Sequence, residues 1–184
     1  MRTASKRHQA IAKHSTLIVR TIGAQSKTGV LERGGMRFRC ALGRTGSKVA
    51  KREGDGATPI GTWQLREAFY RADRITRPRT GLDLRAISRP DGWCDASQDR
   101  NYNRRIVHPY PASAEHLWRE DGLYDIVVVL GYNDAPAIKG CGSAIFLHCA
   151  RDGYPPTQGC IALARRDLVR LMPFLGPNTR LEIP

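Results

Sequence analysis

One histidine and one cysteine close together near the C-terminus could carry chemistry. His148 lies in the apolar run 144–150, and Cys160 follows Gly159 at the start of a second apolar run. A thiol attacks acyl groups as the thiolate, so it needs a nearby base, and the pKa of imidazole suits that role near neutrality. A glycine before the cysteine permits a sharp turn and leaves backbone N–H groups close to a bound carbonyl. The pattern therefore indicates a cysteine acyltransferase.

Two other interpretations fit the same residues. A cysteine in an apolar run is often inert core packing. A metal site is the second, because Cys141, His148, Cys149 and Cys160 lie within twenty residues. However, no C-x-x-C knuckle is present, and neighbours such as His148 and Cys149 point to opposite faces of a strand. We expect no structural zinc, and the acyl-transfer interpretation requires no metal or cofactor.

Size and composition indicate one globular domain. The chain has 184 residues, of which 41% are hydrophobic and 26% charged, which is ordinary for a folded domain. Its five cysteines are an odd number, so at least one is free or pairs outside the chain. No apolar run approaches the ~20 residues of a membrane span, and no signal peptide is visible because Arg20 interrupts the first apolar segment. We expect a flexible basic arm at residues 1–14, a single catalytic domain at 15–184 and a monomer.

Charge is concentrated at the N-terminal end. The formal net charge is +13, and residues 1–52 hold thirteen Lys and Arg but one acid, Glu32. Such a region fits a polyanionic surface, either a cell wall or nucleic acid. No basic helix, aromatic stacking platform or zinc-finger spacing accompanies it, so no specific nucleic-acid binding is predicted.

The elements that position the histidine and the cysteine are mostly strands, because the dominant hydrophobic period is two. Predicted strands cover residues 16–22, 36–40, 62–66, 124–130, 144–150 and 179–183. The segment 124–130 is continuously apolar and β-branched, which predicts burial on both faces. Helical spacing after Asp167 predicts one short helix, which Pro173 shortens; a second is possible at 113–118. Segments 43–61 and 71–110 are read as long loops, so the chain is mainly β with one or two short helices.

Two motifs resemble a known family. Residues 51–63, K-R-E-G-D-G-A-T-P-I-G-T-W, are similar to the G-D-x-x-T-P-x-G-x-[FWY] segment of L,D-transpeptidase (YkuD-like) catalytic domains. His148 with T-Q-G-C-I at 157–161 resembles their H…[ST]-H-G-C nucleophile motif. The order matches, and the resemblance spans residues 16–184, as in a compact single-domain subgroup. It implies a β-sandwich-like fold of mixed sheets with an active-site cleft.

The resemblance also implies roles and a substrate. Cys160 is the nucleophile, His148 the base, and the backbone carbonyl of Cys149 the third member that fixes the ring tautomer. Backbone N–H groups of Gly159 and Cys160 form the oxyanion hole. The reaction is acyl transfer on peptidoglycan stem tetrapeptides, with release of D-alanine, a thioester acyl-enzyme and 3→3 cross-links. Water as acceptor gives an L,D-carboxypeptidase instead, and a non-catalytic wall-binding module is a further alternative.

That substrate implies the periplasm or cell envelope, although the absence of a visible signal peptide leaves a cytoplasmic location open. Two departures from the family pattern affect substrate binding: Gln158 stands at the usual histidine, and Ala162 at a usual polar or basic position. Because guanidinium groups grip carboxylates, a replacement grip is expected from an arginine. The candidate substrate-binding residues are Arg104, Arg105, Arg151, Thr157, Gln158, Tyr102 and Asn103. The His-to-Cys spacing also implies a trimmed loop at 151–156.

Overall fold

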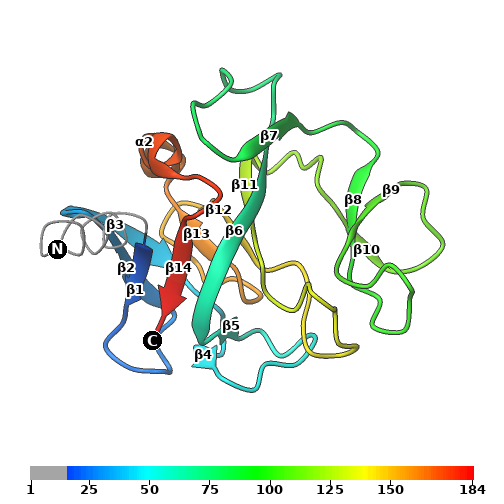
Figure 1. The fold of residues 1–184 in the computed structure, drawn as a ribbon, viewed down its shortest axis with the longest axis horizontal. Coiled ribbons are helices and arrows are strands. Elements are labelled where there is room, and N and C mark those ends of the chain that lie inside the picture. The colour runs from blue at the N-terminus through cyan, green and yellow to red at the C-terminus, as the bar shows by residue number, and fades with distance from the viewer. Residues whose placement is uncertain (1–15) are drawn as a thin grey trace, which may run out of the picture.

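The computed structural model describes residues 16–184, so the predicted basic arm at 1–14 lies outside the described residues. Strands dominate this part of the chain (Figure 1). They are β1 (Thr16–Arg20), β2 (Thr28–Arg33), β3 (Met36–Ala41), β4 (Ser47–Lys48), β5 (Thr58–Pro59), β6 (Gly61–Tyr70), β7 (Asp83–Ala86), β8 (Asp91–Cys94), β9 (Arg105–Val107), β10 (Ala114–His116), β11 (Ile126–Leu130), β12 (Phe146–Cys149), β13 (Ile161–Leu163) and β14 (Arg180–Ile183). All six predicted strands are present, with ends that differ by a few residues.

The main sheet closes on itself. Its strands follow the order β11-β12-β13-β3-β2-β1-β14-β6-β7, and β6 also pairs with β11, which completes a ring. The pairings β1–β14, β12–β13 and β6–β7 are parallel, and the other pairings in this sheet are antiparallel. The inner faces of the ring pack on a shared core, as the two sheets of a sandwich do. The predicted class, mainly β with mixed sheets, is confirmed.

Two hydrophobic clusters lie on opposite faces of β11 and β12. Val128 and Leu130 belong to the cluster inside the ring, which receives side chains from every ring strand. Val127 and Val129 belong to a second cluster on the outer face. The second cluster also contains Trp93 of the three-stranded sheet β10-β8-β9. Burial of β11 on both faces explains its unbroken apolar run and confirms the prediction.

Helix α2 (Arg165–Leu171) lies beside β12 and β13 (Figure 1) and buries Leu168 and Leu171 in the ring core. The helix continues as the 3₁₀ turn η1 (Met172–Phe174), which contains Pro173. Proline has no N–H to donate and its ring clashes with the preceding turn, so the α-helix ends here as predicted. No helix within residues 16–184 is both long and apolar enough to cross a membrane.

The structure corrects two expectations. The segment 113–118 is not helical but contains β10, because its backbone pairs with β8 and places Glu115 opposite Trp93. The segments 43–61 and 71–110 are not unbroken loops, since they contain the short strands β4, β5, β7, β8 and β9. These strands have too few residues to show a periodic pattern, and long-range pairing defines them.

Candidate active site

Neighbouring parallel strands bring the predicted base and nucleophile to one face. His148 of β12 pairs in register with Ala162 of β13. Cys160 precedes Ala162 by two positions, and side chains two apart point to the same face of a strand. Neighbouring strands lie about 4.8 Å apart, so His148 and Cys160 are diagonal neighbours. Both face away from the ring core, because the alternate residues Leu147 and Ile161 fill it.

Both side chains open into one cavity of about 380 Å³. Its walls come from the ends of β12 and β13, the loop 151–158 and the segment that links β10 to β11. The lining residues are Glu115, Arg119, Leu123, Tyr124, His148, Ala150, Arg151, Pro155, Pro156, Thr157, Gln158, Cys160 and Ala162. Of the predicted substrate-binding residues, Arg151, Thr157 and Gln158 therefore border the same space as the thiol.

The tautomer of His148 follows from a single contact. Its Nδ1 lies 2.9 Å from the carbonyl oxygen of Cys149. A carbonyl oxygen can only accept, so Nδ1 carries the proton and Nε2 keeps its lone pair. Burial lowers the pKa of His148 to about 4, despite the opposing effect of this hydrogen bond. The ring is therefore neutral near pH 7, with its Nδ1–H directed at the Cys149 carbonyl and the lone pair on Nε2; the orienting role of that carbonyl stays a prediction.

Cys160 is 8% exposed and rests as a thiol. Its Sγ–H donates to the carbonyl oxygen of Ala144 at 3.2 Å, and Sγ accepts the N–H of Phe146 at 3.4 Å. Burial is the main cause that raises its pKa to about 12, with a further contribution from the Glu115 charge. Ala144 has a φ of 51°, a left-handed conformation unusual for alanine. The thiol must leave Ala144 to reach the Nε2 of His148.

Two hydrogen bonds of Thr157 stabilise the turn that precedes Cys160. The Thr157 hydroxyl donates to the carbonyl oxygen of Cys160 at 2.7 Å and accepts the N–H of Gly159 at 3.1 Å. The Gly159 N–H, expected in an oxyanion hole, is thus occupied and would have to leave Thr157 to serve there. The Cys160 N–H is the other donor that this turn offers to a developing oxyanion.

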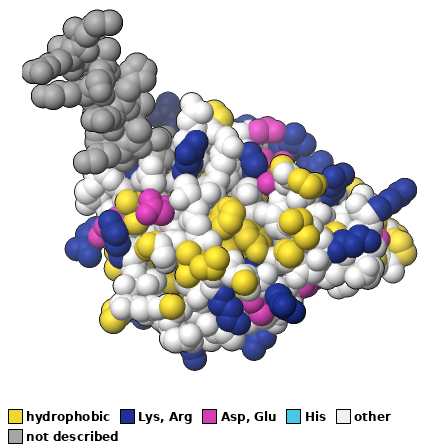
Figure 2. All heavy atoms as spheres, turned by 60° about the horizontal axis from the view of Figure 1, so that its bottom comes forward, with side chains coloured by type: hydrophobic (Ala, Val, Ile, Leu, Met, Phe, Trp, Pro, Cys, Tyr) yellow, Lys and Arg dark blue, Asp and Glu magenta, His cyan; other side chains and the backbone are white. Residues whose placement is uncertain are grey.

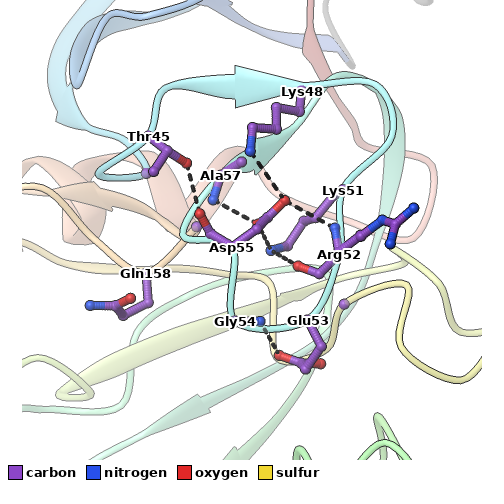
Figure 3. A network of polar contacts seen from close by, with 12 residues as sticks. Thr45, Lys48, Lys51, Arg52, Glu53, Gly54, Asp55, Ala57 and Gln158 are labelled. Atoms are coloured by element: carbon purple, nitrogen blue, oxygen red, sulfur yellow. Dashed lines mark hydrogen bonds and ion pairs between the residues drawn. The ribbon is translucent and has the colours of Figure 1, made fainter.

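The segment 51–61 packs against the turn that precedes Cys160. Asp55 accepts hydrogen bonds from the Lys51 ammonium at 2.9 Å and from the N–H groups of Arg52 at 3.0 Å and Ala57 at 2.9 Å (Figure 3). These contacts lower the pKa of Asp55, although burial alone acts in the opposite direction. The fixed carbonyl of Ala57 would lie only 2.6 Å from a Cβ built on Gly159. This motif therefore positions the turn of the nucleophile.

Gln158 is also anchored. Its side-chain oxygen accepts the Nε–H of Arg44 at 2.9 Å, and the N–H of Arg44 donates to the carbonyl oxygen of Thr157 at 2.9 Å. Where the family has a second histidine, this chain has an amide fixed by a cation. The arrangement leaves His148 as the imidazole of the cavity.

The sequence analysis missed three polar or charged residues of the cavity: Glu115, Arg119 and Tyr124. The Tyr124 ring meets the His148 ring edge-on at 5.4 Å, and its hydroxyl donates to a carboxylate oxygen of Glu115 at 2.6 Å. Burial raises the pKa of Glu115. No motif in the sequence links these residues to the cysteine, because the packing of β10 against β8 brings them there.

The other predicted substrate-binding residues lie elsewhere. Tyr102 donates to Glu53 at 2.6 Å, and its oxygen accepts the N–H of Gly142 at 2.9 Å. Asn103 is 6% exposed and accepts hydrogen bonds from the Trp93 indole and the Ala144 N–H, both at 3.0 Å. Neither these two nor Arg104 and Arg105 line the cavity, so their contact with substrate stays a prediction. Asn103 instead positions the strained residue that holds the thiol.

No group of three His, Cys, Asp or Glu side chains within residues 16–184 is arranged to hold a metal ion. Cys149 packs in the ring core, whereas Cys160 lies in the outer cluster. All five cysteines of the chain are free. The sulfurs of Cys149 and Cys160 therefore lie on opposite faces of the sheet.

Comparisons with known proteins agree with the motifs. Residues 15–183 match the profile of the L,D-transpeptidase catalytic domain, YkuD. A crystal structure of Mycobacterium tuberculosis L,D-transpeptidase 1 aligns at 15% identity and a TM-score of 0.38, over 91% of this chain and 61% of that chain. A search of curated protein sequences gave no match. Because the profile covers nearly all of the sequence, the chain belongs to the L,D-transpeptidase catalytic domain family.

Proposed function

We propose that the protein is a cysteine-dependent L,D-transpeptidase that acts on peptidoglycan stem tetrapeptides and forms 3→3 cross-links. Membership of the family supports an acyltransferase with a peptidoglycan substrate. The observation that carries the finer proposal is that Cys160 and His148 line one cavity, in which a neutral imidazole keeps the lone pair of its Nε2. The site of action of such an enzyme is the cell envelope.

The reaction begins from a neutral pair. Burial disfavours both the thiolate and the imidazolium, so the proton moves as the sulfur attacks and not before. Cys160 rotates from Ala144 towards His148, and its proton passes to Nε2 while the S–C bond forms at the carbonyl of the third stem residue. The resulting oxyanion is held by the Cys160 N–H, and each such donor contributes about 3 kcal/mol to the transition state.

Collapse of the tetrahedral intermediate breaks the C–N bond, and the imidazolium returns its proton to the departing D-alanine amine. A thioester between Cys160 and the tripeptide remains. An amine from a second stem then attacks the thioester and gives its proton to His148. The C–S bond breaks, and the imidazolium passes this proton to the departing thiolate, which restores the thiol of Cys160. The carbonyl of Cys149 stabilises the imidazolium in both steps, because it holds Nδ1–H in place.

Charge supports a wall-associated role. The first fifteen residues hold four of the thirty Lys and Arg and none of the seventeen Asp and Glu, so residues 16–184 keep a net formal charge of +9. Figure 2 shows Lys and Arg side chains spread around a central group of hydrophobic side chains, with fewer acids. A cationic surface is attracted to polyanionic material, which fits a substrate fixed in a cell wall.

The test is product analysis with a stem tetrapeptide, with and without a competing amine. We expect release of D-alanine in both reactions and an amide-linked product with the amine. The Cys160→Ala variant is expected to fold and to release no D-alanine. Turnover by this variant would end the thiol mechanism. Hydrolysis alone, with the amine ignored, would identify the protein as an L,D-carboxypeptidase.

A further inference from the structure

Two arginines at the rim of the cavity share one acid. Arg119 donates its Nε–H and Nη2–H to the two oxygens of Asp121 at 3.0 and 2.6 Å. Arg151 donates its Nη2–H to one of the same oxygens at 2.9 Å. Two cations against one anion leave a charge of +1, and the two arginines lower the pKa of Asp121. This cluster, Arg119–Asp121–Arg151, is called the rim cluster below.

The rim cluster presents its cations to the cavity. Arg119 and Arg151 both line the space that contains Cys160, whereas Asp121 does not and borders a neighbouring hollow. A guanidinium has five N–H donors. Arg119 uses two of them, and Arg151 uses one, in hydrogen bonds to Asp121. Their side chains are 34% and 56% exposed. Donors therefore remain for an anion that enters the cavity, and the acid behind them fixes their direction.

Packing connects the rim cluster to the reacting groups. The Arg119 guanidinium lies 5.3 Å from the centre of the Tyr124 ring, and that ring meets His148 edge-on at 5.4 Å. Ala162 on the cavity floor offers no polar group. Arg104 and Arg105, also candidates for an anion grip, do not line the cavity. Arg119 and Arg151 are thus the cavity's own cationic side chains.

Resting on the proposed function, we infer that the rim cluster binds a carboxylate of the substrate close to the scissile amide. A cavity of 380 Å³ has the volume of a sphere about 9 Å across, and a peptide advances at most about 3.6 Å per residue. The bound carboxylate therefore belongs to the scissile residue pair or its immediate neighbour. Two groups satisfy this condition: the C-terminal carboxylate of the leaving residue, and a side-chain carboxylate on the residue before the scissile amide.

Binding measurements in the Cys160→Ala protein test the inference without chemistry. Three probes are compared by calorimetry: a stem tetrapeptide with both carboxylates, the same peptide with a C-terminal carboxamide, and the same peptide with a side-chain carboxamide. Amidation of the recognised carboxylate is expected to weaken binding about tenfold to a hundredfold, as for a lost charged hydrogen bond. The probe that weakens identifies which carboxylate is bound.

The preference for carboxylate is the ratio of the affinities of the carboxylate probe and of the carboxamide probe that binds more weakly. Arg119→Gln and Arg151→Gln are each expected to reduce this preference severalfold, and the double variant is expected to abolish it. Arg85→Gln is the matched control, because Arg85 also donates two N–H groups to an aspartate two residues away, Asp83, but does not line the cavity. This variant should keep the preference. Circular dichroism checks that each variant folds. Retention of the preference in the double variant, its loss in Arg85→Gln, or equal binding of all three probes by the Cys160→Ala parent would overturn the inference.

The two proposals can fail separately. A tripeptide adduct on Cys160 in the otherwise unaltered protein, without any carboxylate preference, would refute the rim cluster alone. A preference abolished by the arginine substitutions, without any adduct, would refute the thiol chemistry and leave carboxylate binding at the rim cluster established.

Discussion

Gly159→Ala tests whether the segment 51–61 positions the nucleophile. Gly159 has a φ of +133°, a conformation open essentially to glycine, and forcing another residue into it costs about 1–3 kcal/mol. The new Cβ would lie 2.6 Å from the Ala57 oxygen, where ordinary contact begins at 3.4 Å. Because Ala57 is held by the Asp55 network, the turn must move by about 0.8 Å. Displacement of about 1 Å can reduce a rate about a hundredfold.

We therefore expect Gly159→Ala to lower kcat/KM for tetrapeptide acylation about a hundredfold and stability by about 3 kcal/mol. For a domain of this size that corresponds to a fall in Tm of about 6–12 °C. Gly35→Ala, in the turn between β2 and β3, is the matched control, with a φ of +87° and nothing within 4 Å of the new Cβ. It should lose only about 1 kcal/mol and keep its activity. Equal effects of the two substitutions would refute the reasoning.

Three further predictions follow from the site. Because burial raises the pKa of Cys160 to about 12, iodoacetamide labelling of Cys160, followed by peptide mapping in the substrate-free protein, should accelerate tenfold per pH unit from pH 7 to 10. A plateau near neutrality would reveal a resting ion pair. Burial raises the pKa of Glu115 above its ordinary 4.5, so folding loses stability as pH rises through the raised value, and Glu115→Gln should raise Tm more at pH 8 than at pH 4. An equal change at both pH values would exclude that penalty. Thr157→Val removes both hydroxyl hydrogen bonds of the turn that precedes Cys160 and should lower Tm by about 2–6 °C. It should also lower kcat by a larger factor than it raises KM. An unchanged kcat would contradict a positioning role of Thr157.

The sequence predicted the parts of the site that depend on local pattern. The apolar run that contains His148 and the glycine before Cys160 were enough to expect an acyl-transfer pair, and the β-branched run at 124–130 was enough to expect burial on both faces of a strand. The role of Gly159 was only half foreseen. Its conformational freedom is required, but its N–H is committed to Thr157, a contact that depends on side-chain geometry.

Long-range packing explains what the sequence did not predict. Glu115, Arg119 and Tyr124 reach the cavity because β10 pairs with β8 and this small sheet packs on the outer face of β12. Nothing in the local pattern of 113–118 distinguishes that strand from a short helix. Closure of the main sheet likewise depends on β6 meeting β11, strands more than fifty residues apart.

The central claim is that Cys160 forms a thioester with the substrate. Intact mass spectrometry of the protein after brief reaction with a stem tetrapeptide, followed by peptide mapping, measures this directly. The account predicts a mass increase equal to the acyl tripeptide, located on the peptide that contains Cys160 and absent in Cys160→Ala. An adduct on another of the five cysteines, such as the more exposed Cys141, or D-alanine release by the Cys160→Ala variant, would contradict it.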